Sequence, residues 1–143
     1  MVDWSQTPPA LFSVVTGFFP ETRPKHDWAT NPRPLLVTGV FRKRNTSEIF
    51  VRVAYGTSKT QRIPAPPNLC IANMSCLDAL NLARPTTFVI SPGSQMVILP
   101  WSPEHFRPWR GFAAPVIGVL PNDMVAYVRD VIRHLQDLPM PGG

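Results

Sequence analysis

Short runs of branched and aromatic apolar residues, separated by prolines and small polar residues, recur along most of the chain. Runs of this kind are typical of β-strands, because branched and aromatic side chains pack well on a pleated surface. The pattern predicts strands over residues 11–19, 33–43, 48–56, 86–90, 95–101 and 114–120. Only the polar stretch RNTS separates the second run from the third, so these two predict a β-hairpin.

The spacing of apolar residues changes to a helical one near the C-terminus. Residues 122–136 carry apolar side chains at three- and four-residue intervals, which places on one helical face Met124, Val125, Val128, Ile132 and Leu135. Asn122 is a candidate N-cap, and Asp123 suits the positive end of the helix dipole. A shorter helix is predicted over residues 75–83.

The abundance of proline, with 18 among 143 residues, argues against a mainly helical protein, because proline breaks helix interiors. The chain length and the 44% of hydrophobic residues suit one domain with its own core. We therefore expect residues 1–143 to form a single mainly β (α+β) domain. It would be a small, strongly bent antiparallel barrel with a C-terminal helix and one short middle helix. Residues 1–10 and 137–143 are predicted to be flexible tails.

Neither a membrane segment nor a metal site is predicted. No apolar run approaches the roughly 18 residues that span a bilayer, and the N-terminal sequence lacks the basic start and apolar core of a signal peptide. We expect a cytoplasmic protein that does not contact membranes. Cys70, Cys76 and the three histidines form no metal-ligand pattern. We therefore expect no metal, no other cofactor, and two reduced, partly buried thiols.

The net charge of +5 favours an anionic partner, namely RNA, DNA or an acidic protein. Basic residues are concentrated between positions 23 and 62, whereas the acidic residues are spread more evenly. The basic run at 42–44 also fits a solvated hairpin turn, so charge alone does not identify the partner.

Residues 51–61, VRVAYGTSKTQ, place several small hydrogen-bonding groups at the end of a predicted strand. Gly56, Thr57, Ser58 and Lys59 follow one another there. Such a cluster either turns the chain, through hydrogen bonds from side chain to backbone, or binds a ligand with its donors.

Three segments, in chain order, resemble the PemK/MazF family of bacterial toxin endoribonucleases, whose fold is a small SH3-like barrel. NPRPLLVTGVF resembles the family's Arg-Pro pair followed by a hydrophobic strand, and VRVAYGTSKTQ resembles its strand that ends in a Thr-Ser pair. PVIGVLPNDMVAYVRDVI resembles its last strand and C-terminal helix. Residues 62–113 depart from the family, because they are longer and richer in proline than in its compact members.

The resemblance implies a metal-independent endoribonuclease that cleaves single-stranded RNA and uses the RNA 2′-hydroxyl as the nucleophile. It implies catalytic roles for Arg33 and Thr57, which match the family's Arg and Thr. It further implies a toxin–antitoxin system, in which an antitoxin protein covers the basic groove, and a homodimer.

The residues suit that chemistry on physical grounds as well. The planar guanidinium of Arg33 matches phosphate oxygens and stays charged. Thr57 and Ser58 carry hydroxyls that can donate to a phosphate oxygen, and Gly56 would let the backbone come close to it. The opposite interpretation stays open: Arg33 pairs with a carboxylate, and the GTS stretch caps a strand end.

Further candidates for substrate binding and proton transfer lie near these residues in sequence. Lys25 and Lys59 suit electrostatic guidance of the RNA backbone. Trp28 suits stacking on an unpaired base, although a hydrophobic contact under its loop explains it equally well. His26 is the candidate for proton transfer, and a solvated loop histidine is the simpler interpretation.

Two other functions remain open from the sequence. A barrel without catalysis would act as an adaptor or inhibitor that grips another protein with its aromatic and proline-rich middle. In that segment, Trp101 and Trp109 indicate packing or a partner surface. A toxin that acts on a protein target such as a topoisomerase would belong to the same fold group and need no Arg-Thr site.

Overall fold

The computed structural model describes residues 4–18, 33–58, 68–90, 96–109 and 111–136, with the backbone alone at 134–136. Its helices and strands are η1 (Trp4–Gln6), β1 (Ser13–Gly17), β2 (Arg33–Arg42), β3 (Ile49–Thr57), β4 (Leu69–Ile71), α1 (Met74–Ala79), β5 (Thr86–Phe88), β6 (Val97–Pro100), β7 (Val116–Val119) and α2 (Asn122–Gln136). Every predicted strand and both predicted helices are present among them, several with shifted ends.

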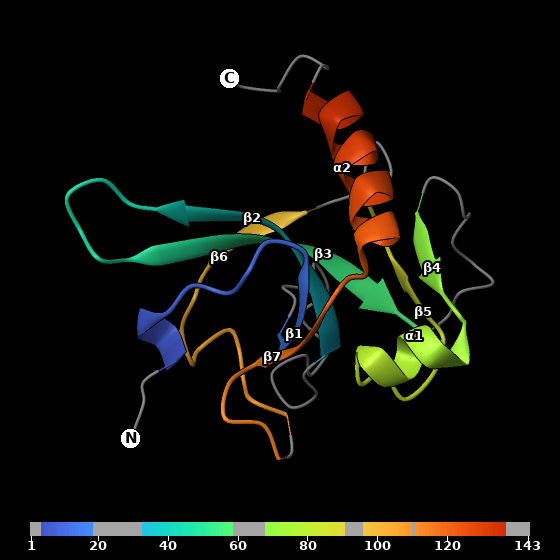
Figure 1. Ribbon diagram of the computed structural model, residues 1–143. Coiled ribbons are helices and arrows are strands. Elements are labelled where there is room, and N and C mark those ends of the chain that lie inside the picture. Colours follow the sequence, from blue (N-terminus) through green and yellow to red (C-terminus); the bar gives the residue numbers. More distant parts are fainter. Residues whose placement is uncertain (1–3, 19–32, 59–67, 91–95, 110, 137–143) are drawn as a thin grey trace, which may run out of the picture.

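One antiparallel sheet contains the described strands and curls around β3 (Figure 1). The strand order is β4-β5-β3-β2-β1-β7, and β6 pairs with β3 off this path. From Phe50 to Val53, β3 lies between β2 and β6, whereas its last residues, Gly56 and Thr57, pair with β5. The result is a strongly curled antiparallel half-barrel, which confirms the predicted mainly β class with a middle and a C-terminal helix.

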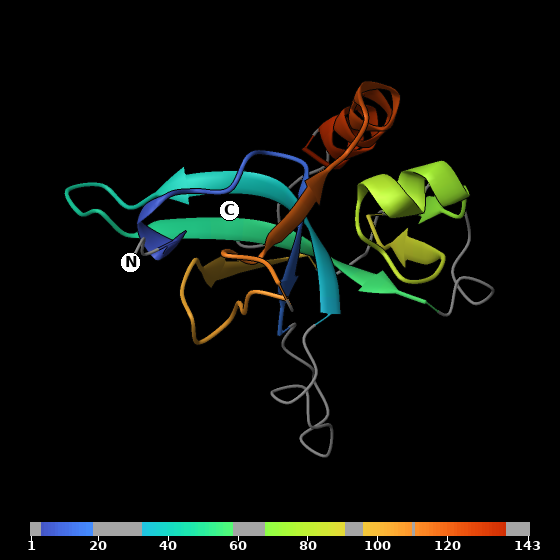
Figure 2. The same cartoon turned by 60° about the horizontal axis from the view of Figure 1, so that its bottom comes forward.

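The two ends of β3 lie in different parts of the molecule. Figure 2 shows β3 running from the β2–β3 hairpin toward α1, β4 and β5, which lie at the other end. Register shifts in β2, between Val37 and Gly39, and in β1, between Val14 and Val15, accompany the curl. Such irregularities increase local twist and bend a strand, so they help the sheet to close on itself.

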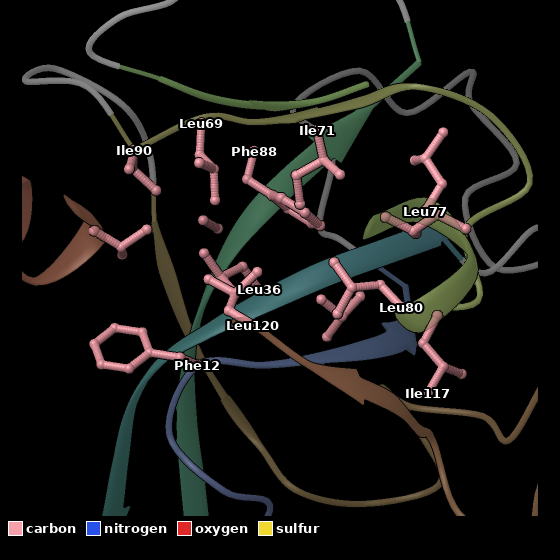
Figure 3. Close-up of a cluster of buried hydrophobic side chains, with 14 of the residues drawn as sticks. Phe12, Leu36, Leu69, Ile71, Leu77, Leu80, Phe88, Ile90, Ile117 and Leu120 are labelled. Atoms are coloured by element: carbon pink, nitrogen blue, oxygen red, sulfur yellow. The ribbon is translucent and has the colours of Figure 1, made fainter. Parts of the chain in front are cut away.

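Two hydrophobic clusters occupy the two faces of the sheet. Neighbouring residues of a strand face opposite sides, and in β2 Leu36 belongs to one cluster while Leu35 and Val37 belong to the other. The first cluster includes residues of α1 and α2 that pack onto the sheet. Figure 3 shows Leu80, which directly follows α1, and Ile117 of β7 on the same side of this cluster.

Helix α2 matches its prediction in extent and in the face that it buries. Val128 and Ile132 are buried, and Val125 is partly buried against the first cluster. The capping prediction is wrong, because the helix begins at Asn122 itself and the Val125 N–H donates to the Pro121 carbonyl at 3.0 Å. Pro121 therefore holds the N-cap position. None of the described helices has the length and apolar content to cross a membrane.

The apolar pattern does not reveal strand β4. This strand has only three residues, too few for a period to stand out. Its middle residue, Cys70, is exposed rather than partly buried, whereas Cys76 is half-buried as expected, and both thiols are free.

Residues 4–7, part of the segment predicted as a flexible tail, lie against the sheet. The indole N–H of Trp101 is shared between the carbonyls of Trp4, at 3.2 Å, and Thr7, at 3.0 Å. The Trp4 and Trp101 rings also meet edge to face, with centroids 4.9 Å apart. The predicted C-terminal tail, residues 137–143, lies outside the described residues.

The curl of β3 depends on a close approach at Gly56. A Cβ atom on Gly56 would lie 2.5 Å from the Pro34 carbonyl oxygen and 2.9 Å from the Phe88 ring. The first neighbour is strand backbone and the second is a fully buried side chain, so neither can move far. Glycine is therefore required here by the packing of β2 against β5.

We expect Gly56→Ala to lower the free energy of unfolding by roughly 1–3 kcal/mol, the usual cost of overpacking a filled site. Gly39→Ala is the matched control, since its Cβ would meet mainly the edge of the exposed Phe41 ring, which can turn away. Urea unfolding followed by tryptophan fluorescence measures both variants. Equal stability of the two would contradict this role of Gly56.

Candidate functional site

A cavity of about 600 Å³ opens where β3 leaves β2 and turns toward β5. Its wall combines residues of β1, β2, β3 and β7 with the connection between α1 and β5 and with Trp109. These elements surround a common space because the sheet is curled; in a flat sheet, β5 and β7 would lie at distant positions of one plane. The cavity is thus a product of the bend in β3.

The structure brings together part of the predicted site. Of the predicted site residues, those that line the cavity are Arg33, Gly56, Thr57 and Ser58. The predicted residues that lie outside the described part of the chain are Lys25, His26, Trp28 and Lys59. Arg33 begins β2 and Thr57 ends β3, so the antiparallel pairing of the hairpin places them at the same end of the sheet.

Arg33 is exposed, and Tyr55 orients its guanidinium. Nη1 donates to the Tyr55 hydroxyl at 2.5 Å, and Cζ lies 5.6 Å from the centroid of the same ring. Leu35 pairs with Tyr55 across the two strands, and Arg33 lies two residues earlier, on the same face of β2. Among the described residues this phenol, and not a carboxylate, is its partner. A guanidinium has five N–H donors, and the Tyr55 hydroxyl accepts from one of them.

Thr57 and Ser58 differ in exposure although they are neighbours. Thr57 is 7% exposed and pairs with Thr87 of β5, whereas Ser58 is exposed. Gly56 lines the cavity, and its role in letting the backbone approach a phosphate stays a prediction. Protein atoms of β2 and β5 fill the space where a side chain would stand. Gly56 therefore serves to join β2 to β5, which in turn sets the position of Thr57.

Asn81, which the sequence analysis did not single out, closes helix α1 and forms part of the cavity wall. It adopts a left-handed backbone conformation, with φ of 56°, and its N–H donates to the Asp78 carbonyl at 3.2 Å. The next N–H, of Leu82, donates to the Leu77 carbonyl at 2.9 Å, which completes a Schellman-type helix end. The Asn81 Nδ2 donates to the Ile117 carbonyl at 2.7 Å and so ties the helix end to β7.

Arg84 supplies a second positive charge to the cavity, from the connection between α1 and β5. Its carbonyl accepts a hydrogen bond from the Thr86 hydroxyl at 3.0 Å, just before β5 begins. The sequence offered a signal for this residue, because Arg84-Pro85 repeats the Arg33-Pro34 pair in front of a strand. A residue before proline is held in an extended conformation, which suits a strand entry.

Trp109 also lines the cavity, in contrast to Trp101. Trp109 is 44% exposed, whereas Trp101 is 4% exposed and belongs to the second cluster. The segment before Trp109 is held to β1, since the Thr16 hydroxyl donates to the Arg107 carbonyl at 2.5 Å and the Arg107 N–H donates to the Thr16 carbonyl at 3.1 Å. Trp101 is thus a packing residue, whereas the exposed Trp109 can contact a ligand.

The lining of the cavity combines positive charge with hydroxyl groups. Arg33 and Arg84 are its charged side chains, and no carboxylate occurs among the described residues that line it. Arginine binds phosphate oxygens through parallel hydrogen bonds and keeps its charge at any physiological pH. In the described part of the chain, no group of His, Cys, Asp and Glu residues is placed to hold a metal ion. The cavity therefore suits a phosphodiester.

The basic run at 42–44 does not contribute to this cavity. It lies at the tip of the β2–β3 hairpin, at the other end of β3 from Thr57. The strand between them is about 26 Å long at the usual rise per strand residue. Residues 41–48 are exposed, as the solvated-turn interpretation expects.

Arg52 does not line the cavity either, because its guanidinium bonds to Thr38 within the sheet. Its Nε donates to the Thr38 hydroxyl at 3.1 Å, and its Nη2 donates to the Thr38 carbonyl at 2.9 Å. Burial lowers the pKa of Arg52 from its ordinary value, although an arginine remains charged at neutral pH. This cation therefore joins β3 to β2.

No protein-family model matches this chain, and a search of curated proteins finds no significant sequence match.

We expect Asn81→Ala to lower the free energy of unfolding by about 2 kcal/mol, because it removes the bond to Ile117 and leaves alanine in a left-handed conformation. Asn81→Gly is the control, since glycine loses only the bond and should cost about 1 kcal/mol. Urea unfolding compares the two. A glycine variant as unstable as the alanine variant would show that the backbone conformation contributes nothing.

Proposed function

We propose that the protein is a toxin-type, metal-independent endoribonuclease that cleaves single-stranded RNA, similar to the PemK/MazF family. The observation that carries the proposal is the meeting of Arg33 and Thr57 at one cavity, which also contains Arg84 and no carboxylate among its described lining. These two residues match the family's catalytic pair. The curled half-barrel with a C-terminal helix is compatible with a small SH3-like barrel.

The RNA supplies its own nucleophile in the proposed reaction. The 2′-oxygen bonds to the adjacent phosphorus while the bond from phosphorus to the 5′-oxygen breaks. The products are a 2′,3′-cyclic phosphate and a free 5′-hydroxyl. One proton leaves the 2′-hydroxyl and one reaches the departing 5′-oxygen. The transition state carries added negative charge on the phosphoryl oxygens, which positioned donors stabilise.

Arg33 binds the phosphoryl oxygens of the scissile phosphate, and Thr57 donates to one of them. Tyr55 holds the guanidinium, so less of its conformational freedom is lost when the substrate binds. Arg84 contributes positive charge from the connection between α1 and β5 and suits a neighbouring phosphate. His26 remains the candidate for proton transfer.

An antitoxin protein and a second copy of the chain are the proposed partners. An acidic antitoxin segment would cover the arginine-lined cavity, in agreement with the net charge of +5. Pairing of two barrels through an isologous interface follows the habit of the family.

A second candidate function is a non-catalytic barrel that acts as a protein-binding adaptor or inhibitor. The observation that favours it is an apolar row across three strands, in which Phe50 of β3 pairs with Phe41 of β2 and with Pro100 of β6. Phe41 is 43% exposed, and Ile98, two residues from Pro100, is 57% exposed. Exposed apolar groups that adjoin one another are typical of protein-binding surfaces.

Cleavage of a mixed-sequence RNA in the presence of EDTA tests the proposed function. We expect the wild-type protein to produce cyclic phosphate and 5′-hydroxyl ends, and Arg33→Ala and Thr57→Ala each to slow cleavage by about 100-fold or more, the usual effect of removing a donor to the transition state. Arg44→Ala is the matched control, because it removes an exposed arginine at the far hairpin tip.

Undiminished cutting by both site variants would overturn the assignment of Arg33 and Thr57. Failure of the wild-type protein to cut any RNA would overturn the endoribonuclease proposal and leave the adaptor function.

Tyr55→Phe tests how the arginine is held. The variant keeps the ring under the guanidinium but removes the hydroxyl that accepts from Nη1. We expect kcat to fall by roughly 5- to 10-fold, less than in Arg33→Ala, because a bond to a charged group is lost while the charge stays in place. Single-turnover cleavage measures this step, and an unchanged rate would contradict a positioning role.

A further inference from the structure

We propose that the cavity continues into a nucleobase-binding subsite, in which an unpaired base next to the cleaved phosphate stacks on Trp109. This inference rests on the proposed function. A second cavity, of about 310 Å³, adjoins the first, and both are lined by Asn81, Leu82, Ala83 and Trp109. The indole is therefore part of the wall that the two compartments share.

The two compartments differ in charge. The first carries Arg33 and Arg84, whereas the second carries Asp78 and no cationic side chain among its described lining. A phosphate is attracted to the first compartment and repelled from the second. An uncharged group covalently attached to that phosphate is not repelled from the second compartment. In RNA, the nearest large uncharged group is a base, so the charge pattern assigns the phosphate and the base to separate compartments.

The apolar surface of the second compartment suits a flat aromatic ligand. Leu77 and Phe112 line it together with Trp109. Phe112 packs against the first hydrophobic cluster and Leu77 is buried in it, so both are anchored. Trp109, in contrast, leaves 44% of its surface exposed. Stacking of a base on such an indole is the main source of affinity in many single-strand binders.

Asp78 adds a preference among bases. Its side chain is exposed on the last turn of α1, beside the apolar surface. A carboxylate only accepts hydrogen bonds, so it pairs with an exocyclic amino group. Adenine, cytosine and guanine have such a group, whereas the donor of uracil, N3–H, lies between two carbonyl oxygens that repel a carboxylate. The subsite therefore favours an amino-bearing base over uracil.

Binding of oligonucleotides that cannot be cut separates this subsite from the chemistry. Fluorescein-labelled oligodeoxyadenylate, oligodeoxycytidylate and oligodeoxyuridylate lack the 2′-hydroxyl, so fluorescence anisotropy reports binding alone. We expect Trp109→Ala to weaken binding of oligodeoxyadenylate by about 5- to 100-fold, and Trp109→Phe to weaken it by less than about threefold. Leu11→Ala, which removes an equally exposed apolar side chain that lines neither compartment, is the matched control with unchanged affinity.

The base preference is tested with Asp78→Asn. The carboxamide donates as well as accepts, so it pairs with uracil too. We expect the wild-type protein to bind oligodeoxyadenylate at least about fivefold more tightly than oligodeoxyuridylate, and the variant to reduce this ratio toward one. The fold should tolerate the change, because a negative charge in the last turn of a helix is unfavourable.

The possible outcomes distinguish the two proposals. Equal affinities of Trp109→Ala and Leu11→Ala would overturn the base subsite, while RNA cleavage that depends on Arg33 would still support the nuclease. Binding that depends on Trp109, in a protein that cuts no RNA, would support the subsite and overturn the nuclease. No binding of any of the three oligonucleotides by the wild-type protein would overturn the subsite.

Discussion

The double pairing of β3 is the constraint on which the rest of the structure depends. Its first half pairs with β2 on one side and with β6 on the other, while its last two residues pair with β5. The change of partner is possible only if backbone of β2 and the Phe88 ring both reach the Cα of Gly56. A side chain at that position would collide with the Pro34 carbonyl and the Phe88 ring, so the junction of β2 and β5 needs a glycine.

The same curl decides which side chains share the cavity. Because β3 turns at Gly56, its last residue and the first residue of β2 face the connection between α1 and β5. That connection is itself held by Asn81, whose left-handed backbone ends α1 and whose side chain bonds to β7. Two cationic side chains of the described lining, Arg33 and Arg84, lie in one compartment, and the carboxylate of Asp78 lies in the other beside Leu77 and Phe112. Phosphate binding and base stacking are thus proposals about two neighbouring compartments with complementary chemistry.

Much of the architecture was predictable from local pattern, and part of the site was predictable from resemblance. The 15 residues of α2 show a regular apolar period, because each turn repeats the contact with the sheet, and the long strands β2 and β3 are runs rich in branched and aromatic residues. Arg33 and Thr57 were candidates because they match the Arg and Thr of the family that the sequence resembles. Arg84 and Trp109 were not, since each lies in a connection whose place depends on contacts made far away in sequence, such as those between Thr16 and Arg107.

The sequence by itself determined the class of the fold, the number and order of its longer elements, and the buried face of the C-terminal helix. These are local properties, since the alternation of apolar residues along a strand or helix selects both its conformation and its inner face. Only the tertiary structure decided that the basic run at 42–44 lies far from the site, and that Arg33, Thr57, Arg84 and Trp109 border one space. The physical reason is that a cavity is defined by the distance between separate segments, and that distance is set by the packing at Gly56 and Asn81 rather than by the charged and aromatic side chains that would contact a ligand.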